Sequence, residues 1–204
     1  MLAPLSASLR SLQRIFEKRS SWIKKERALQ ASNNLRPGFT DGSFFPYLGC
    51  RCVLFVSQGM ERPRSCALGI KRFHVHVPDT SMSAEGLRDE VRLELLLWIK
   101  KRARIKLKKR LDFWAQRLRV DYKRFVLSNP KRRWGSCSCD NVIRLNWRLM
   151  LAPLPVVDYV VAHELCHVRH KNHSVRFWSA LAEGMPDYKD RRKQLRRIEK
   201  ALEI

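Results

Sequence analysis

The sequence predicts an α+β fold in which a small, mainly antiparallel sheet packs on one buried helix and on one long basic helix. Two observations support this prediction. Segments with helical apolar spacing alternate with short segments rich in strand-forming residues, and one helical segment is apolar on every side. We expect an N-terminal helix over residues 1–30 and a domain over residues 31–204 that forms one compact unit with it.

The first part of the chain is expected to form a helix followed by strands. Apolar residues recur at helical spacing from about Ser6 to Gln30, and the stretch 31–43, which contains Asn, Pro and Gly, predicts a loop. Residues 44–59 and 65–78 are each typical of a short strand, and a turn containing Gly and Pro joins them. In the second of these, apolar residues alternate with histidines, which indicates a sheet with one covered face.

A long helix and a hairpin are predicted next. Apolar residues recur at three- and four-residue steps from about Ser83 to Leu118, and this helix contains the basic stretch KKRARIKLKKR. Residues 124–150 are typical of extended chain, with a turn at Asn129 and Pro130 and a hairpin whose turn lies near Asp140 and Asn141.

Two further helices follow. The first begins after Pro153 and Pro155, since proline is tolerated in a first turn, and its valine-rich start leaves almost no polar face. The second begins at Ser174, a suitable N-cap, and ends at Gly184. The tail beyond it is again amphipathic and basic.

The chain is strongly basic. Its 42 Lys and Arg residues against 19 Asp and Glu residues give a formal charge of +23. Such a charge favours a polyanionic partner, for example nucleic acid or nucleotide phosphates bound through the basic helix, or an acidic protein surface. The alternative for the basic helix is an ordinary solvated face.

Neither a membrane segment nor a secretion signal is predicted. No stretch approaches the ~18–20 apolar residues that a membrane helix needs, and Arg and Gln interrupt the apolar residues at the N-terminus. Without a secretion signal, the six cysteines are typical of reduced thiols in a cytosolic protein. We therefore expect a cytoplasmic protein with no membrane partner.

The buried helix contains an HExxH motif. His163 and His167 lie four residues apart, so both imidazoles face the same side of the helix and can bind one zinc ion at ~2.0–2.1 Å. Glu164 lies beside them, where it could accept a proton from a water molecule that the metal activates. Polar groups at the end of a buried helix need such a reason to be there.

A catalytic zinc site requires a third protein ligand, and three residues compete for that role. His170 lies ~4.5 Å further along the helix axis than His167, which suits a surface or supporting residue better. His173 is reachable if the chain turns back near Asn172, a residue type that tolerates the left-handed conformation. Glu183 on the next helix is the third candidate, and position alone favours His173 over it.

The stretch KRRWGSCSCDNVIRLNWRLMLAPLPVVDYVVAHELCHVRHKNHSVRFW, residues 131–178, resembles the YgjP-like zinc metallopeptidases, which are related to the SprT-like proteases. Weaker similarity extends upstream through PYLGCRCVL and the long helix. The resemblance implies a zincin-like fold for residues 31–204, with Zn2+ bound by His163, His167 and His173 and with Glu164 as the general base. It also implies a protein or peptide substrate.

The predicted hairpin offers a strand edge for such a substrate. An extended peptide can bind through backbone hydrogen bonds to an exposed strand, and Gly135 would let another backbone approach closely. The candidate substrate-binding residues are therefore Trp134, Gly135, Ser136 and Cys137. The alternative is that Trp134 and Trp147 pack in the core and that Cys137 and Cys139 are structural.

The oxyanion of the transition state needs a further donor, for which several side chains are open. These candidates are Arg144, Arg148, Tyr159 and Tyr188.

Two other functions compete with the peptidase. One is a pyrophosphatase that cleaves nucleoside triphosphates such as UTP; the basic surface is compatible with it, although the chain has no Walker-type glycine loop. The other is a non-catalytic nucleic-acid-binding protein with a structural zinc. Glu164 argues against this one, because a structural site usually closes with four protein ligands and needs no base.

Overall fold

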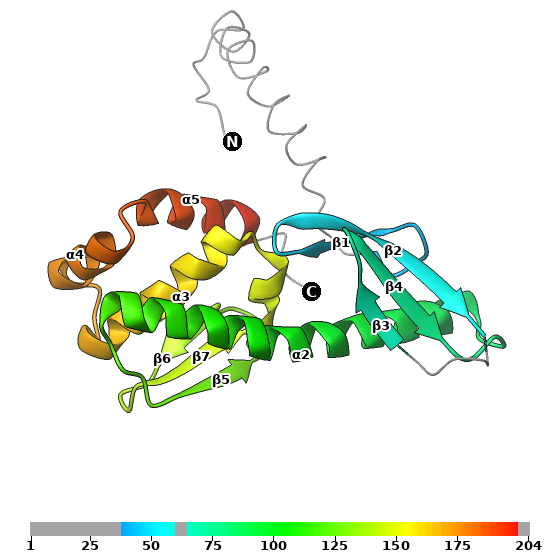
Figure 1. The fold of residues 1–204 in the computed structure, drawn as a ribbon, viewed down its shortest axis with the longest axis horizontal. Coiled ribbons are helices and arrows are strands. Elements are labelled where there is room, and N and C mark those ends of the chain that lie inside the picture. Colours follow the sequence, from blue (N-terminus) through cyan, green and yellow to red (C-terminus); the bar gives the residue numbers. More distant parts are fainter. Residues whose placement is uncertain (1–37, 60–64, 200–204) are drawn as a thin grey trace, which may run out of the picture. The chain divides into compact units, whose positions relative to one another are not determined.

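The computed structural model describes residues 38–59 and 65–199, which lie within one compact unit that begins at Arg36 (Figure 1). The expected helix over residues 1–30 lies outside the described residues. The strands are β1 (Phe44–Tyr47), β2 (Cys50–Gln58), β3 (Ser65–Leu68), β4 (Arg72–Val77), β5 (Arg124–Ser128), β6 (Gly135–Cys137) and β7 (Val142–Asn146). The helices are α2 (Ala84–Leu118), the short 3-10 helix η1 (Trp147–Leu151), α3 (Leu154–Arg169), α4 (Val175–Gly184) and α5 (Tyr188–Ile198).

The first sheet has the strand order β1-β2-β4-β3. Each segment predicted to be one strand is a pair of strands, because a tight turn at Gly49 divides β1 from β2 and another at Gly69 precedes β4. Gly49 has φ +83°, and a Cβ there would lie 3.0 Å from Cα of Pro153, so glycine suits the position twice over. The outer pairs are antiparallel, whereas β2 and β4 are parallel.

The second sheet has the order β5-β7-β6. The predicted hairpin is present: β6 and β7 are antiparallel, and their turn passes through Asn141 in the left-handed region, φ 59°. β5 pairs with β7 in parallel. The prediction of one small sheet is therefore wrong, since the described residues form two sheets and each mixes parallel with antiparallel pairs.

The length of α2 explains why there are two sheets. Its 35 residues span roughly 50 Å, more than one small sheet can cover. Its N-terminal cap is Ser83, whose side chain accepts a hydrogen bond from the backbone N of Gly86 at 3.2 Å. A buried stripe of residues four apart runs along it: Val91, Leu95, Ile99, Ala103, Leu107 and Leu111. It packs against β3 and β4 of the first sheet and against β5 and α3 further along the chain.

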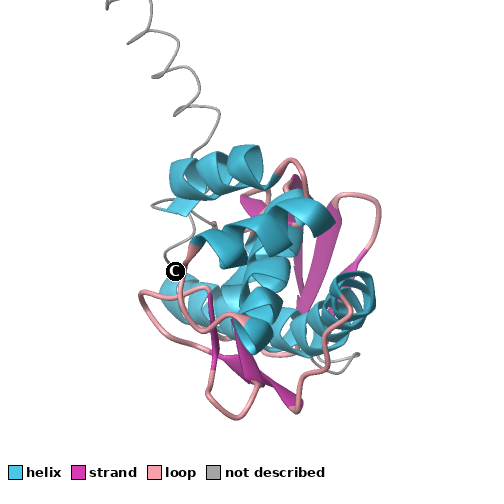
Figure 2. Ribbon diagram, turned by 90° about the vertical axis from the view of Figure 1, so that its left-hand side faces the viewer, coloured by secondary structure: helices cyan, strands magenta, loops and turns pink. Residues whose placement is uncertain are grey.

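Helix α3 is the most buried helix described. It contacts α2, α4, α5, η1, β6 and β7 (Figure 2). Its one buried charge before the HExxH motif, Asp158, accepts two hydrogen bonds from Arg110 of α2 at 2.6 Å and 2.8 Å. Arg191 of α5 lies 3.9 Å from the same carboxylate. The Asp158 carboxylate of α3 therefore links three helices, α2, α3 and α5.

Among the described residues, no helix is both long enough and apolar enough to cross a membrane.

Candidate metal centre

Helix α3 places two imidazoles side by side. The ring centroids of His163 and His167 lie 5.0 Å apart, as expected for residues one helical turn apart on the same face. Both rings are half-buried, while Glu164 between them is only 7% exposed. The helix therefore presents two imidazole rings near the surface and keeps a carboxyl group beneath them.

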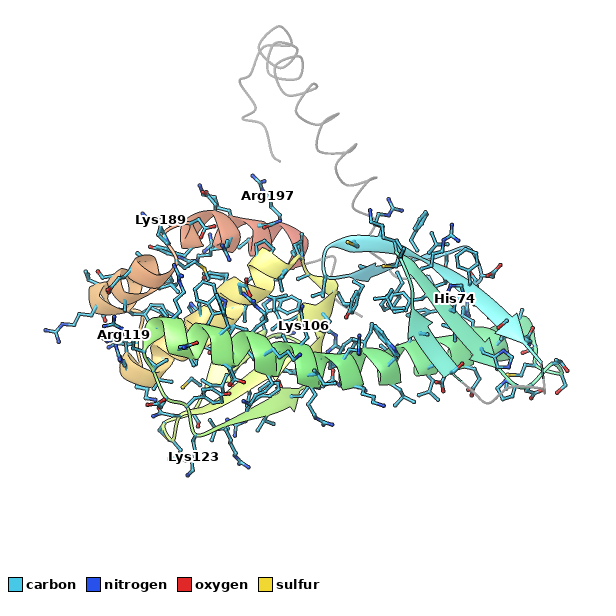
Figure 3. All side chains as sticks on the ribbon, viewed as in Figure 1. His74, Lys106, Arg119, Lys123, Lys189 and Arg197 are labelled. Carbon is cyan, nitrogen blue, oxygen red and sulfur yellow. The ribbon has the colours of Figure 1, made fainter. Side chains whose placement is uncertain are left out.

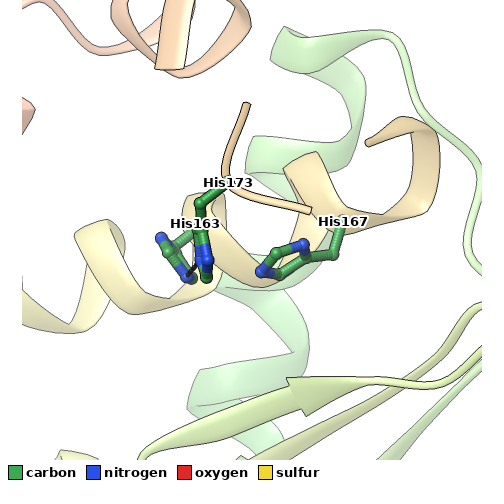
Figure 4. Close-up of side chains that lie close together, drawn as sticks. All are labelled: His163, His167 and His173. Carbon is green, nitrogen blue, oxygen red and sulfur yellow. Dashed lines mark hydrogen bonds between the residues drawn. The ribbon is translucent and has the colours of Figure 1, made fainter. Parts of the chain in front are cut away.

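The chain then turns and brings a third imidazole to the first two. α3 ends at Arg169, and His170 leaves the helix in an extended conformation, φ −123° and ψ 95°. Asn172 is not left-handed, so that expectation for the turn is wrong: the extended His170 redirects the chain instead. His173 precedes the N-cap of α4, and its Nε2 lies 3.0 Å from Nε2 of His163 (Figure 4).

The three histidines fit one divalent metal ion. One ligand atom from each lies within 4.8 Å of the others. Two nitrogens bound at ~2.0–2.1 Å to one tetrahedral ion are roughly 3.3 Å apart, close to the spacing of His163 and His173. No other group of three such side chains occurs in the described ranges.

The protonation of the rings favours metal binding. Burial lowers the pKa of His163 to about 3, and it also lowers the pKa of His167, so both rings are neutral near neutral pH. Nδ1 of His167 lies 2.9 Å from the carbonyl oxygen of His170. This contact makes Nδ1 the donor and leaves the Nε2 lone pair of His167 for a metal. Nδ1 of His163 is buried without a partner.

Two aromatic side chains pack against the three imidazole rings. Phe177, fully buried in the first turn of α4, has its ring centroid 4.6–4.9 Å from all three imidazoles. Trp178 stacks on His173 at 5.5 Å and 22°. Sequence reasoning did not single out either residue. The only local signal was their position directly after the third histidine and the Ser174 cap.

Glu164 lies against strand β6. A Cβ added at Gly135 would be 2.6 Å from Cγ and 2.7 Å from Oε1 of Glu164, so only glycine leaves room for this carboxyl group. Burial raises the pKa of Glu164 to about 8. β6 has β7 as its one partner in the sheet and is therefore an edge strand beside the carboxyl group.

The four predicted substrate-binding residues lie in or next to this edge strand. Trp134 is half-buried, and its Nε1 donates to Oε1 of Glu199 at 3.3 Å, so it is not a core residue, whereas Trp147 is. Ser136 alternates with Gly135 and faces away from α3. Cys137 faces the same side as Gly135, with Nζ of Lys171 3.9 Å from its sulfur.

The other candidate ligands lie elsewhere. Glu183 and His170 line a different pocket, beside Cys166 and the end of α2, and neither belongs to the histidine group. The carbonyl group of His170 does support His167, in line with a supporting role. Cys166 is buried in the core, and all six cysteines are free.

The oxyanion candidates separate into near and far residues. The Tyr159 ring lies 5.8 Å from His163, and Tyr188 stacks on Trp178 at 5.6 Å. Arg144 pairs with Ser136 on the face away from α3. Arg148 donates to Asn129 at the end of β5. Tyr159 therefore lies beside the histidines and Tyr188 beside Trp178, whereas Arg144 faces away from α3.

A family model for the YgjP-like metallopeptidase domain matches residues 1–198. The chain belongs to the YgjP-like family. Its class is therefore that of a metallopeptidase, a hydrolase acting on proteins or peptides, and the resemblance seen at residues 131–178 is confirmed.

No curated protein sequence matches the chain. A similar solved structure is the metallopeptidase zymogen abylysin of Pyrococcus abyssi, 19% identical, covering 46% of this chain and 93% of that chain with a TM-score of 0.41. A likeness of this degree transfers no residue role.

Proposed function

We propose that the YgjP-like chain is a zinc-dependent peptidase with a zincin-like fold, in which His163, His167 and His173 bind the metal and Glu164 is the general base. The convergence of three imidazole nitrogens within 4.8 Å supports this proposal most directly. Neutral imidazoles suit zinc, and a site with three protein ligands leaves one position open for chemistry.

A bound zinc ion would act as a Lewis acid that makes water a nucleophile and polarises the scissile carbonyl group. Glu164 accepts the proton of the attacking water and later donates it to the leaving amine. Burial raises the pKa of Glu164, which makes its carboxylate a stronger proton acceptor. Tyr159 and Tyr188 are the nearest candidate donors to the oxyanion.

The substrate binds in extended form along β6. Its backbone pairs with the free edge at Gly135, Ser136 and Cys137, which needs no particular sequence. Because Gly135 touches Glu164, a chain bound there passes directly beside the general base. Trp134, at the start of this edge and tied to Glu199, borders the same path.

The test compares zinc-loaded with metal-free protein on a casein-type substrate and on UTP, with zinc content measured by mass spectrometry. We expect zinc-dependent cleavage of casein that Glu164→Gln abolishes while zinc stays bound. Cleavage of UTP alone, lost in the same variant, would replace the peptidase with a pyrophosphatase. Absence of both activities in zinc-loaded protein would overturn the proposal.

We further propose that α2 binds polyanions such as nucleic acid or nucleotide phosphates. Lys100, Arg104 and Lys108 lie one turn apart on α2; Lys100 approaches the Trp147 ring just after β7, and Lys108 approaches Tyr122 just before β5. We call these three residues the basic row. Basic side chains also project elsewhere, for example Lys123 and Arg197 (Figure 3).

Fluorescence anisotropy with labelled single-stranded DNA at several salt concentrations tests the basic row. We expect the doubly substituted Lys100→Gln, Arg104→Gln protein to bind more weakly. Its salt dependence should also be shallower, by about 0.7 in log–log slope for each phosphate that the protein no longer neutralises. The exposed pair Lys189 and Arg197 on α5, changed in the same way, is the matched control. Equal weakening in both proteins would show a diffuse charge effect and no basic row.

A further inference from the structure

Arg192 lies on α5 one helical turn from the buried Tyr188. The neighbouring Arg191 is neutralised, since it donates to Asp187 at 2.8 Å and lies 3.9 Å from Asp158. Arg192 is half-buried, and among the described residues no hydrogen bond or ion pair involves it.

This guanidinium lies beside the metal centre. Its Cζ is 4.8 Å from the centroid of the Trp178 ring, and that ring stacks on His173 at 5.5 Å. The two spacings together place Cζ within about 10 Å of the His173 ring. Burial raises the pKa of Tyr159 and lowers the pKa of His163, and the charge of Arg192 acts on both groups by lowering the pKa of each.

No acidic side chain of α5 compensates this charge. Asp187 pairs with Arg191, and Asp190 pairs with Lys193 at 3.3 Å. A guanidinium has five N–H donors in a planar fork, which matches a carboxylate. Holding such a group half-buried and unpaired costs free energy, which an anion supplied by a ligand would recover.

A group that stabilises the reacting oxygen must lie ~2.7–3.1 Å from it. The two spacings measured through Trp178 set only an upper limit on the separation of Arg192 from the His173 ring, and this limit is within reach of the side chains of a bound peptide. An extended peptide advances ~3.3–3.6 Å per residue. The guanidinium can therefore reach the side chain of a peptide residue up to about three positions from the scissile bond.

We infer that Arg192 is a specificity-determining residue that binds a carboxylate side chain of the peptide substrate, within about three residues of the scissile bond. The YgjP-like chain would thus prefer acidic segments of proteins. This inference rests on the proposed peptidase function and adds the substrate class.

The test measures peptide binding, so it does not require turnover. Zinc-loaded Glu164→Gln protein is titrated with fluorescent peptides in matched pairs that carry Glu or Gln at one position on either side of a central bond. Arg192→Gln and Arg192→Lys are added in this background. Lys193→Gln is the matched control, because it removes one positive charge from the adjacent exposed position of the same helix. Zinc content and melting temperature establish that each variant is folded and loaded.

At one position the Glu peptide should bind about tenfold more tightly than the Gln peptide, equivalent to one charge-assisted hydrogen bond. Arg192→Gln should reduce this preference to less than about twofold, Arg192→Lys should keep part of it, and Lys193→Gln should leave it unchanged. Equal binding of all pairs by the parent protein, or a preference that survives Arg192→Gln, overturns the inference. UTP competes as a further probe, and an Arg192-dependent affinity for UTP without a preference for Glu peptides also overturns it.

Cleavage separates this inference from the proposed function. Binding that depends on Arg192, without hydrolysis of any peptide by the unsubstituted zinc enzyme, would refute the peptidase and uphold the carboxylate site. Hydrolysis at equal rates for Glu and Gln peptides would uphold the peptidase and refute the carboxylate site.

Discussion

Replacing Gly135 by alanine should misplace Glu164, the proposed general base, without touching the proposed metal ligands. The added Cβ would lie 2.6 Å from Cγ and 2.7 Å from Oε1 of Glu164, whereas ordinary contacts begin near 3.4 Å. The two groups must therefore separate by roughly 1 Å. Glu164 is 7% exposed and has little room to retreat, so either β6 moves outward or the carboxyl group rotates away from the histidines.

A misplacement of about 1 Å in a reacting group costs about 100-fold in rate, and we expect kcat to fall by that order. Zinc content should not change, because none of the three histidines is among the atoms nearest the new Cβ. The assay combines steady-state kinetics on a peptide substrate with metal analysis and a thermal melt. Gly69→Ala is the matched control, since its nearest neighbour would lie at 3.8 Å.

The reasoning would be refuted by Gly135→Ala protein that folds, binds zinc and turns over substrate at the original rate. Loss of zinc together with activity would also contradict it, because the effect would then have reached the ligands and not Glu164.

Three further outcomes are expected. Asp158→Asn should lower the free energy of unfolding by about 3 kcal/mol, because Arg110 loses a bidentate partner in a largely buried setting. Denaturant titration measures this free energy, and a change below about 1 kcal/mol would contradict the prediction. Trp178→Leu should weaken zinc binding about tenfold in a chelator competition, because the ring that orients His173 is removed; unchanged affinity would refute this support. Burial raises the pKa of Cys166 to about 12, so almost no thiolate forms near neutral pH. Mass spectrometry should therefore find Cys166 alkylated far more slowly than the exposed Cys50, and equal rates would contradict this.

Local signals predicted the helices well. The Ser83 cap and the stripe of apolar residues four apart set the limits of α2, and Pro153 and Ser174 marked the starts of α3 and α4 within a residue. The hairpin turn near Asn141 was equally predictable, because a left-handed asparagine in a short loop is a local feature.

Long-range pairing was not predictable. The parallel pairs β2–β4 and β5–β7 join strands that are not successive in the chain, and no periodicity within one strand identifies its partner. For the candidate metal site, the spacing of His163 and His167 is local, and position along the chain already favoured His173 over Glu183 before the family resemblance added to it. Arg192 could not be found, because its place depends on α5 folding back over α3.

The third imidazole stands only six positions along the chain from the second, and this short separation limits what a cation could contribute to folding. Closing so small a ring restricts the unfolded chain little, and the core formed by α2, α3 and the second sheet does not depend on it. The metal-free protein should therefore keep its fold, with local unfolding confined to the turn between α3 and α4. Zinc would then bind after folding and exchange readily. The fraction of protein with zinc bound would depend on the concentration of free zinc.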